Sequence, residues 1–112
     1  MQNVTTPTSK NYQDYLNIAL NDPQRAAGNI QMALEEKERL TGLLKLTIED
    51  IINARKNTNN LSKSAQLAYE KLAEILSQTD GQEIYAFIDL LETLGLQLTL
   101  IVSESSNLSF DD

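Results

Sequence analysis

Apolar residues recur every three or four positions along most of this chain, the spacing of a helix that buries one face. The first such stretch ends near Asn21. The second begins at Asp22-Pro23, where a side-chain acceptor precedes proline at the first helical position. A third carries a broad apolar stripe as far as Ile52 and ends at the polar cluster Asn57–Asn60, whose short side chains compete with the helical backbone.

Two more helical patterns follow, one over residues 62–77 and one from Ile84 to Leu94, with a short polar turn between them. Gly95 ends the second, since glycine readily adopts the left-handed backbone that terminates a helix. Together the patterns predict an all-α fold of about five helices. They assign to the core Leu16, Ile30, Leu34, Leu44, Ile48, Ile51, Leu61, Leu72, Leu76, Ile88, Leu91 and Leu94.

After Gly95 the period changes to two, which predicts a short C-terminal β-strand. A lone strand exposes backbone donors and acceptors, and the same strand from a second copy would satisfy them. We therefore expect a homodimer, and the candidate dimer-strand residues are Leu96, Leu98, Leu100 and Val102. The alternative is that this segment packs on its own helices as extended chain.

The length of 112 residues and the 41% hydrophobic content fit a single domain with one core. We place this domain at residues 10–102, between a disordered leader (1–9) and a disordered tail (103–112), both without apolar periodicity. No apolar run approaches the roughly 20 residues that span a bilayer, and the start lacks a secretion-signal pattern. We therefore expect a cytoplasmic protein with no membrane contact.

The chain contains no Cys and no His. Disulfides, thiolate metal sites, cysteine nucleophiles and imidazole acid–base chemistry are therefore all excluded. Paired acids such as Glu35-Glu36 are consecutive, and consecutive residues do not face one another on a helix. We therefore expect a protein that is not an enzyme, with no catalytic residues, no metal and no cofactor.

A net charge of −7 argues against a general affinity for nucleic acid, because phosphate contacts need Lys and Arg. The charge is unevenly distributed, however. Between residues 51 and 73 the charged residues are Arg55, Lys56, Lys63 and Lys71, with Glu70 the one acid, and no basic residue follows Lys71. This positive patch is a candidate for binding DNA, and the alternative is an ordinary solvated surface.

Six short motifs occur in a particular order: Tyr15-Leu16, Asp22-Pro23, Ala26-Ala27, Ala33-Leu34-Glu35-Glu36, Ala54-Arg55 and Thr93-Leu94-Gly95-Leu96-Gln97-Leu98. In this order and spacing they resemble the antidote proteins of toxin–antitoxin addiction modules (the HigA type), a repressor-like helix-turn-helix family. The resemblance covers roughly residues 12–98 and implies a lambda-repressor-like fold. It also implies an antitoxin that binds operator DNA as a dimer, regulates its own transcription and neutralises a cognate toxin. Many such toxins are basic, which suits this acidic chain.

The resemblance also implies where DNA would bind. The first helix of the motif would span about residues 59–65, the turn would fall near Gln66-Leu67, and the recognition helix would span about Ala68–Leu76. A recognition helix reads bases with residues near its N-terminal end, while flanking basic residues neutralise phosphates. The implied base-reading residues are Ala68, Tyr69, Lys71 and Glu74, and the implied phosphate contacts are Arg55, Lys56 and Lys63.

The residues at the expected turn support a second interpretation. Family members have a glycine and a serine helix cap there, whereas this chain has Gln66 and Ala68. Glutamine does not readily adopt a left-handed backbone, and alanine has no oxygen to cap a helix. By periodicity alone, Ser62 to Ser77 form one uninterrupted amphipathic helix. The chain would then be a degenerate helix-turn-helix fold, a protein-interaction module without DNA binding.

Overall fold

The computed structural model describes residues 9–103, which contain five α-helices. They are α1 (Ser9–Asn21), α2 (Pro23–Glu35), α3 (Leu43–Asn57), α4 (Lys63–Thr79) and α5 (Gln82–Thr93). The predicted all-α class and helix number are confirmed. The expected C-terminal strand is wrong, because residues 96–103 form no β-structure. The predicted disordered leader and tail lie almost wholly outside the described residues.

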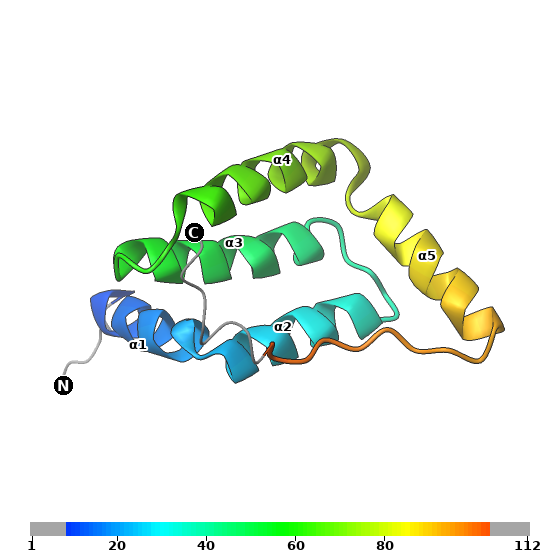
Figure 1. Ribbon diagram of the computed structural model, residues 1–112, viewed down its shortest axis with the longest axis horizontal. Helices are drawn as coiled ribbons and strands as arrows, with labels where there is room; N and C mark the ends of the chain where they lie inside the picture. The colour runs from blue at the N-terminus through cyan, green and yellow to red at the C-terminus, as the bar shows by residue number, and fades with distance from the viewer. Residues whose placement is uncertain (1–8, 104–112) are drawn as a thin grey trace, which may run out of the picture.

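Helix α3 lies at the centre of the molecule (Figure 1). It packs against α1, α2 and α4, running antiparallel to both α2 and α4. Helix α5 crosses one end of the molecule, from the α4 side to the α2 side. After α5 the chain turns back and follows α2 as an extended segment.

Local sequence explains where several helices begin. The Asp22 carboxylate accepts a hydrogen bond from the Gln24 amide (3.0 Å), directly before Pro23 opens α2. Ser62 caps α4 in the same manner, with its hydroxyl oxygen accepting from the Ala65 amide (3.1 Å). These side chains satisfy amides that have no partner within the helix.

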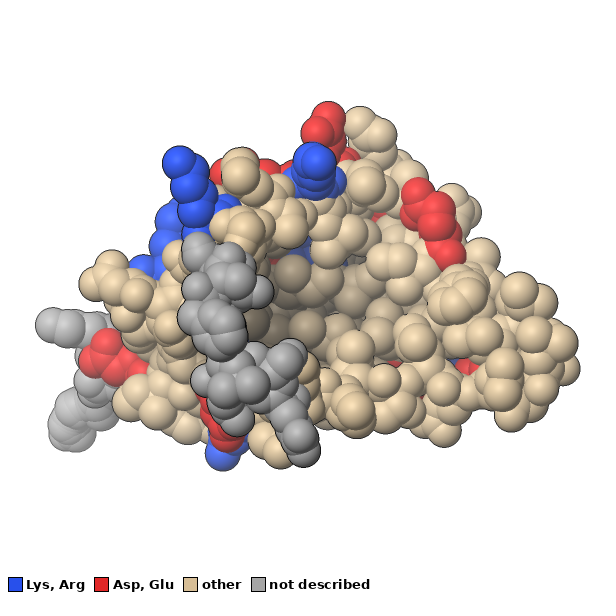
Figure 2. Space-filling model, in the orientation of Figure 1, with Lys and Arg blue, Asp and Glu red and all other residues tan. Residues whose placement is uncertain are grey.

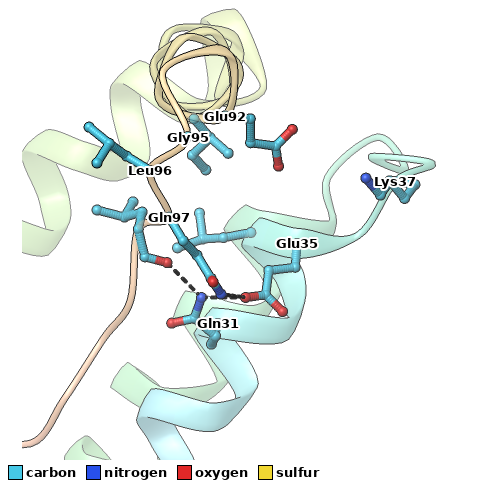
Figure 3. Close-up of a pocket in the computed structure, with 10 residues that line it drawn as sticks. Gln31, Glu35, Lys37, Glu92, Gly95, Leu96 and Gln97 are labelled. Carbon is cyan, nitrogen blue, oxygen red and sulfur yellow. Dashed lines mark hydrogen bonds between the residues drawn. The ribbon is translucent and has the colours of Figure 1, made fainter.

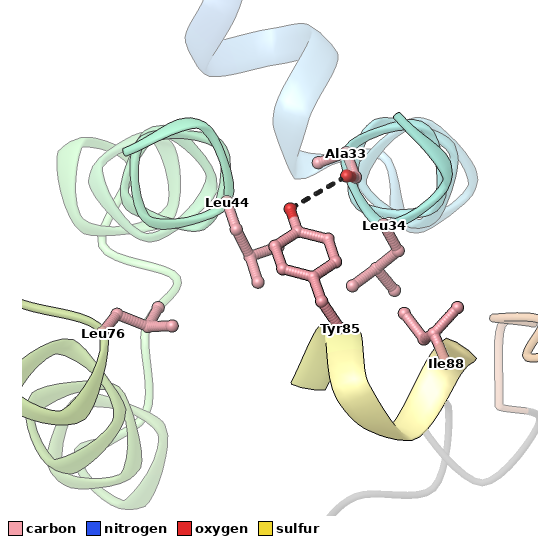
Figure 4. Close-up of a cluster of buried hydrophobic side chains, with 6 residues drawn as sticks. All are labelled: Ala33, Leu34, Leu44, Leu76, Tyr85 and Ile88. Carbon is pink, nitrogen blue, oxygen red and sulfur yellow. Dashed lines mark hydrogen bonds between the residues drawn. The ribbon is translucent and has the colours of Figure 1, made fainter. Parts of the chain in front are cut away.

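The core consists of two connected clusters of buried side chains. The larger contains Ala33, Leu34, Leu44, Leu76, Tyr85 and Ile88, contributed by α2, α3, α4 and α5 (Figure 4). The smaller contains Leu20, Ala26, Ile51 and Ala54, and fixes α1 against α2 and α3. Ile30 contacts both clusters, so the interior is continuous along α2.

Most of the predicted core residues lie inside the molecule. Leu34, Leu44, Ile51, Leu76 and Ile88 are buried, and Leu16, Ile30, Ile48, Leu61, Leu72 and Leu91 are half-buried. Leu94 is the exception, with 62% of its surface exposed. It follows the last turn of α5, on the side of that helix facing away from the core. Leu67, a buried position in the antitoxin resemblance, is also exposed (54%).

We predict that Gly81→Ala destabilises the fold more than Gly95→Ala. Both glycines have a left-handed backbone (φ 81° and 77°), where alanine costs about 1–2 kcal/mol. A Cβ atom at Gly81 would also lie 3.1 Å from Leu44 Cδ2, whereas one at Gly95 would have no neighbour within 4 Å. Crowding in the core should add about 1 kcal/mol or more at Gly81 alone.

Urea unfolding of the two variants measures this difference. Equal losses in the free energy of unfolding would show that the contact between a Cβ at position 81 and Leu44 adds no cost.

Candidate interaction surfaces

The segment expected to contain a helix-turn-helix is a single helix. Helix α4 runs without a break from Lys63 to Thr79, so the predicted turn at Gln66-Leu67 and the separate recognition helix Ala68–Leu76 are wrong. The alternative, one helix over residues 62–77, is confirmed. The physical reason is that Ser62 supplies the cap that starts the helix, and Gln66 continues it instead of reversing the chain.

The four candidate base-reading residues therefore lie along the middle of α4. Ala68, Lys71 and Glu74 are exposed. Tyr69 is half-buried and its hydroxyl donates to Glu49 Oε2 on α3 (3.2 Å). Burial, followed by the nearby Glu49 carboxylate, raises the pKa of Tyr69. Tyr69 thus binds α4 to α3 and is turned away from the other three.

The candidate phosphate-binding residues come together. Arg55 and Lys56 occupy the last turn of α3, and Lys63 is the first residue of α4. Figure 2 shows basic side chains gathered at this end of the molecule. Lys71 lies on the same helix as Lys63, about 12 Å farther along and about 80° around the axis. We call Arg55, Lys56 and Lys63 the basic end.

A network of amides holds the basic end in place. The Asn21 side chain, at the end of α1, donates to the Ala54 carbonyl (3.1 Å) and to the Thr58 hydroxyl (3.0 Å). It also accepts from the Asn60 side chain (2.9 Å). The sequence marked the cluster Asn57–Asn60 only as a helix terminator. Its second role, docking α1 against the α3–α4 junction, depends on Asn21, a residue 37 to 39 positions away.

The four candidate dimer-strand residues lie in the extended segment beside α2. Leu98 and Val102 are half-buried, whereas Leu96 and Leu100 are exposed (54% and 37%). One side chain binds the backbone of this segment: Gln31 donates to the Leu98 carbonyl (2.8 Å) and accepts from the Leu100 amide (2.7 Å). In this chain the segment therefore packs on its own helices as extended chain, the arrangement given above as the alternative, and pairing with a second copy stays a prediction.

A groove lies between the extended segment, α2 and α5 (Figure 3). Its volume is about 530 Å³. Leu34, Ile88 and Leu98 form apolar parts of its wall, and Gln31, Glu35 and Gln97 meet at its edge. Glu35 Oε2 accepts from both Gln31 (2.7 Å) and Gln97 (3.2 Å).

A second groove of about 260 Å³ lies between α2 and α3. Met32 and Leu43 contribute apolar walls, and Glu36 and Asp50 contribute carboxylates. Burial, followed by the neighbouring Glu49, raises the pKa of Asp50. A cationic side chain in this groove would favour the charged form of the Asp50 carboxyl.

An ion pair connects the α2–α3 loop to α5. Both terminal nitrogens of Arg39 bind the Asp89 carboxylate (3.0 and 2.6 Å), and the guanidinium lies 4.6 Å from the centre of the Tyr85 ring. This hydrogen bonding to Arg39 lowers the pKa of Asp89. Both side chains are partly solvent-exposed, so salt screens the attraction.

Other kinds of site find no support in the part of the chain that the structure describes. Over residues 9–103 no group of three or more acidic, His or Cys side chains is placed to hold a metal ion. Within the same range no helix has the length and apolar character to cross a membrane. Comparison with protein-family models, curated proteins and solved structures finds no match to this chain.

We predict that Asp89 titrates below the usual Asp range, and that Arg39→Ala returns its pKa toward that range. Arg39→Lys should have an intermediate effect, since lysine keeps the charge but loses the two-pronged geometry. Carboxyl ¹³C NMR titration measures each value, with Arg25→Ala as the control that leaves Asp89 unchanged. Because the folded pKa is depressed, any stability from this pair is present at neutral pH and is lost as the pH falls through that pKa. A normal Asp89 titration in the unmodified protein would contradict the pairing.

Proposed function

We propose that this chain is a protein-interaction module of the antitoxin type, which binds a basic protein partner without reading DNA sequence. The unbroken α4 is the observation that carries this proposal. A helix-turn-helix inserts the N-terminal end of its second helix into the major groove, and this requires a turn in front of that helix. The corresponding residues here lie in the middle of one helix, and Tyr69 is bound to Glu49.

The charge of the chain supports a basic partner. The net charge is −7, and opposite charge on a partner speeds and orients association. The groove between α2 and α3 combines apolar walls with Glu36 and Asp50, which suits the stem and head of a lysine or arginine side chain. We expect the module to act in the cytoplasm as a homodimer, and its partner to be a basic toxin.

DNA binding is the second candidate, favoured by the basic end. Arg55, Lys56 and Lys63 lie at the junction of two helices, and Lys63 opens α4, whose N-terminal amides attract anions. Such a surface is suited to phosphates more than to base edges. An operator-binding antitoxin would need this surface together with Lys71.

Fluorescence anisotropy with DNA from the chain's own promoter separates the two candidates. We expect weak binding, indifferent to sequence and steeply weakened by salt. Lys63→Ala and Lys71→Ala should weaken it alike, each reducing the slope of log affinity against log salt by about 0.9, and Lys37→Ala serves as the control. Promoter-specific binding that Lys71→Ala relaxes at one base pair, with a loss of about 1–3 kcal/mol, would establish base reading instead.

Co-expression with a small basic reading frame adjacent to this gene tests the protein partner. We expect the neighbouring product to inhibit growth alone, and this chain to restore growth and co-purify with it. The Lys63→Ala/Lys71→Ala double variant should restore growth equally, because protein binding uses neither the basic end nor Lys71. The double substitution Glu36→Lys/Asp50→Lys should impair rescue, since it reverses the charge of the α2–α3 groove. Full rescue by that variant would show that the partner does not bind in the α2–α3 groove.

A further inference from the structure

We propose that the basic end (Arg55, Lys56 and Lys63) is a docking surface for residues 104–112 of the same chain, here called the acidic segment. This segment follows the residues that the structure describes. When docked, it covers cations that would otherwise be open to phosphates. Neither the basic partner nor the α2–α3 groove takes part in this contact.

The basic end has no anionic partner in the part of the chain that the structure describes. Among residues 9–103 no acidic side chain forms a salt bridge with Arg55, Lys56 or Lys63, and the one salt bridge in this range connects the α2–α3 loop to α5. Three cations gathered at one end of the molecule repel one another (Figure 2). An anionic group placed among them would relieve that repulsion.

The acidic segment has the complementary charge. It contains Glu104, Asp111 and Asp112, and it has neither Lys nor Arg. Phe110 directly precedes the two aspartates, so the segment carries an aromatic ring beside a pair of carboxylates. A surface that fits it needs an exposed apolar side chain next to basic ones.

Such an apolar side chain adjoins the basic end. Leu67 lies four residues after Lys63, so the two side chains are neighbours on the surface of α4. Leu67 is 54% exposed. A Phe110 ring packed on Leu67 would remove apolar surface of both from water and set the carboxylates after it beside Lys63. Glu70 lies a further turn along α4, on the other side of Leu67, and so away from these carboxylates.

The described chain leads toward this surface. After α5 it runs beside α2 in the reverse direction (Figure 1). Glu35 accepts from Gln97, and Gln31, one turn nearer the start of α2, accepts from the Leu100 amide. The start of α2 lies about 12 Å beyond Gln31, and residues 101–103 can cover most of that length.

A groove of about 440 Å³ continues from the end of α1 to the loop between α3 and α4. Ile18, Asn21, Asn59 and Asn60 are among the residues that line it. The Asn60 side chain donates to Asn21 (2.9 Å), so the end of α1 touches the loop that leads into α4. Residues 104–112 can extend over roughly 30 Å, which is enough to follow this groove and reach the basic end.

A contact of this kind is weak by itself and sensitive to salt. Exposed ion pairs contribute little individually, and salt screens them. Because the acidic segment belongs to the same chain, its effective concentration at the basic end is on the order of millimolar. A segment docked in about three of every four molecules would weaken the apparent affinity for DNA about fourfold.

Paramagnetic NMR tests the contact in the full chain, which has no native cysteine to compete for a label. Ser109→Cys carries a nitroxide beside Phe110, and the protein is labelled with ¹⁵N. We expect the amide signals of Lys63 and Leu67 to broaden at about 10 mM salt, and to recover at about 1 M, where the screening length falls from about 30 Å to about 3 Å. The amide signals of α5, at the other end of the molecule, should not change.

Removing charge from the acidic segment should release it. Asp111→Asn/Asp112→Asn in the labelled chain should reduce the broadening several-fold at low salt. The matched control Glu38→Gln/Glu92→Gln removes the same charge from exposed positions elsewhere and should leave the broadening unchanged. Equal broadening in both variants would show that the segment is tethered near the basic end without binding it, and would overturn the proposal.

Removing charge from the basic end is the reciprocal test. Lys56→Ala/Lys63→Ala should reduce the broadening at Leu67, whereas Lys37→Ala/Lys45→Ala, with the same loss of charge, should not. A mixture of labelled ¹⁴N chains and unlabelled ¹⁵N chains identifies the copy that is contacted. Broadening in that mixture would place the segment on a second copy, contrary to the docking within one chain proposed here.

DNA affinity measures whether the docked segment covers the basic end. At low salt Asp111→Asn/Asp112→Asn should bind a DNA duplex of arbitrary sequence several-fold more tightly than Glu38→Gln/Glu92→Gln. The two variants have the same net charge, so a general electrostatic effect cancels in this comparison. Equal affinities would show that the segment does not shield these cations.

Discussion

The packing of Tyr85 holds α5 in place, and so it also determines where the extended segment after α5 and the groove between that segment, α2 and α5 lie. Its ring extends from α5 between Leu44 and Leu34, and its hydroxyl donates to the Ala33 carbonyl at 3.2 Å (Figure 4). Arg39 covers the ring from the α2–α3 loop. Satisfying the hydroxyl matters because a buried polar group without a partner costs about 1–3 kcal/mol.

Helix α4 shows how one missing turn changes what a helical protein can do. A short helix preceded by a tight turn can project from its domain, but a continuous helix of 17 residues lies along α3. Arg55, Lys56 and Lys63 still lie together although the turn is absent, because their place at the α3–α4 junction does not depend on that turn. Electrostatic attraction to phosphates is therefore separable here from the reading of bases.

Helix α5 and the extended segment that follows it both expose apolar side chains, among them Leu90 and Leu96. A five-helix domain of this size has few elements with which to cover both faces of its last helix, and after α5 the chain turns back along α2 (Figure 1). Phe87, Leu90 and Leu94 on the outer side of α5 are therefore exposed.

Signals near in sequence identified the helices correctly. Asp22-Pro23 and Ser62 start helices because their oxygens reach amides two or three residues ahead, and Gly95 follows the end of α5 because it tolerates a positive φ. Apolar periodicity likewise placed Leu34, Leu44, Ile51, Leu76 and Ile88 in the interior. The same periodicity predicted one continuous helix at α4, whereas the family resemblance implied a turn near Gln66-Leu67.

Only the tertiary structure decided the questions that involve distant partners. A helix with one apolar face has one side to bury, but α5 is apolar on both sides, and packing alone buried Ile88 and left Leu94 exposed. The alternating segment after Gly95 has the local pattern of a strand, yet a strand requires a second strand beside it. Here the Leu98 carbonyl and the Leu100 amide bind the Gln31 side chain of α2 instead. The sequence by itself determined the helices, because their hydrogen bonds close within four residues; the neighbour each surface meets is set by the fold.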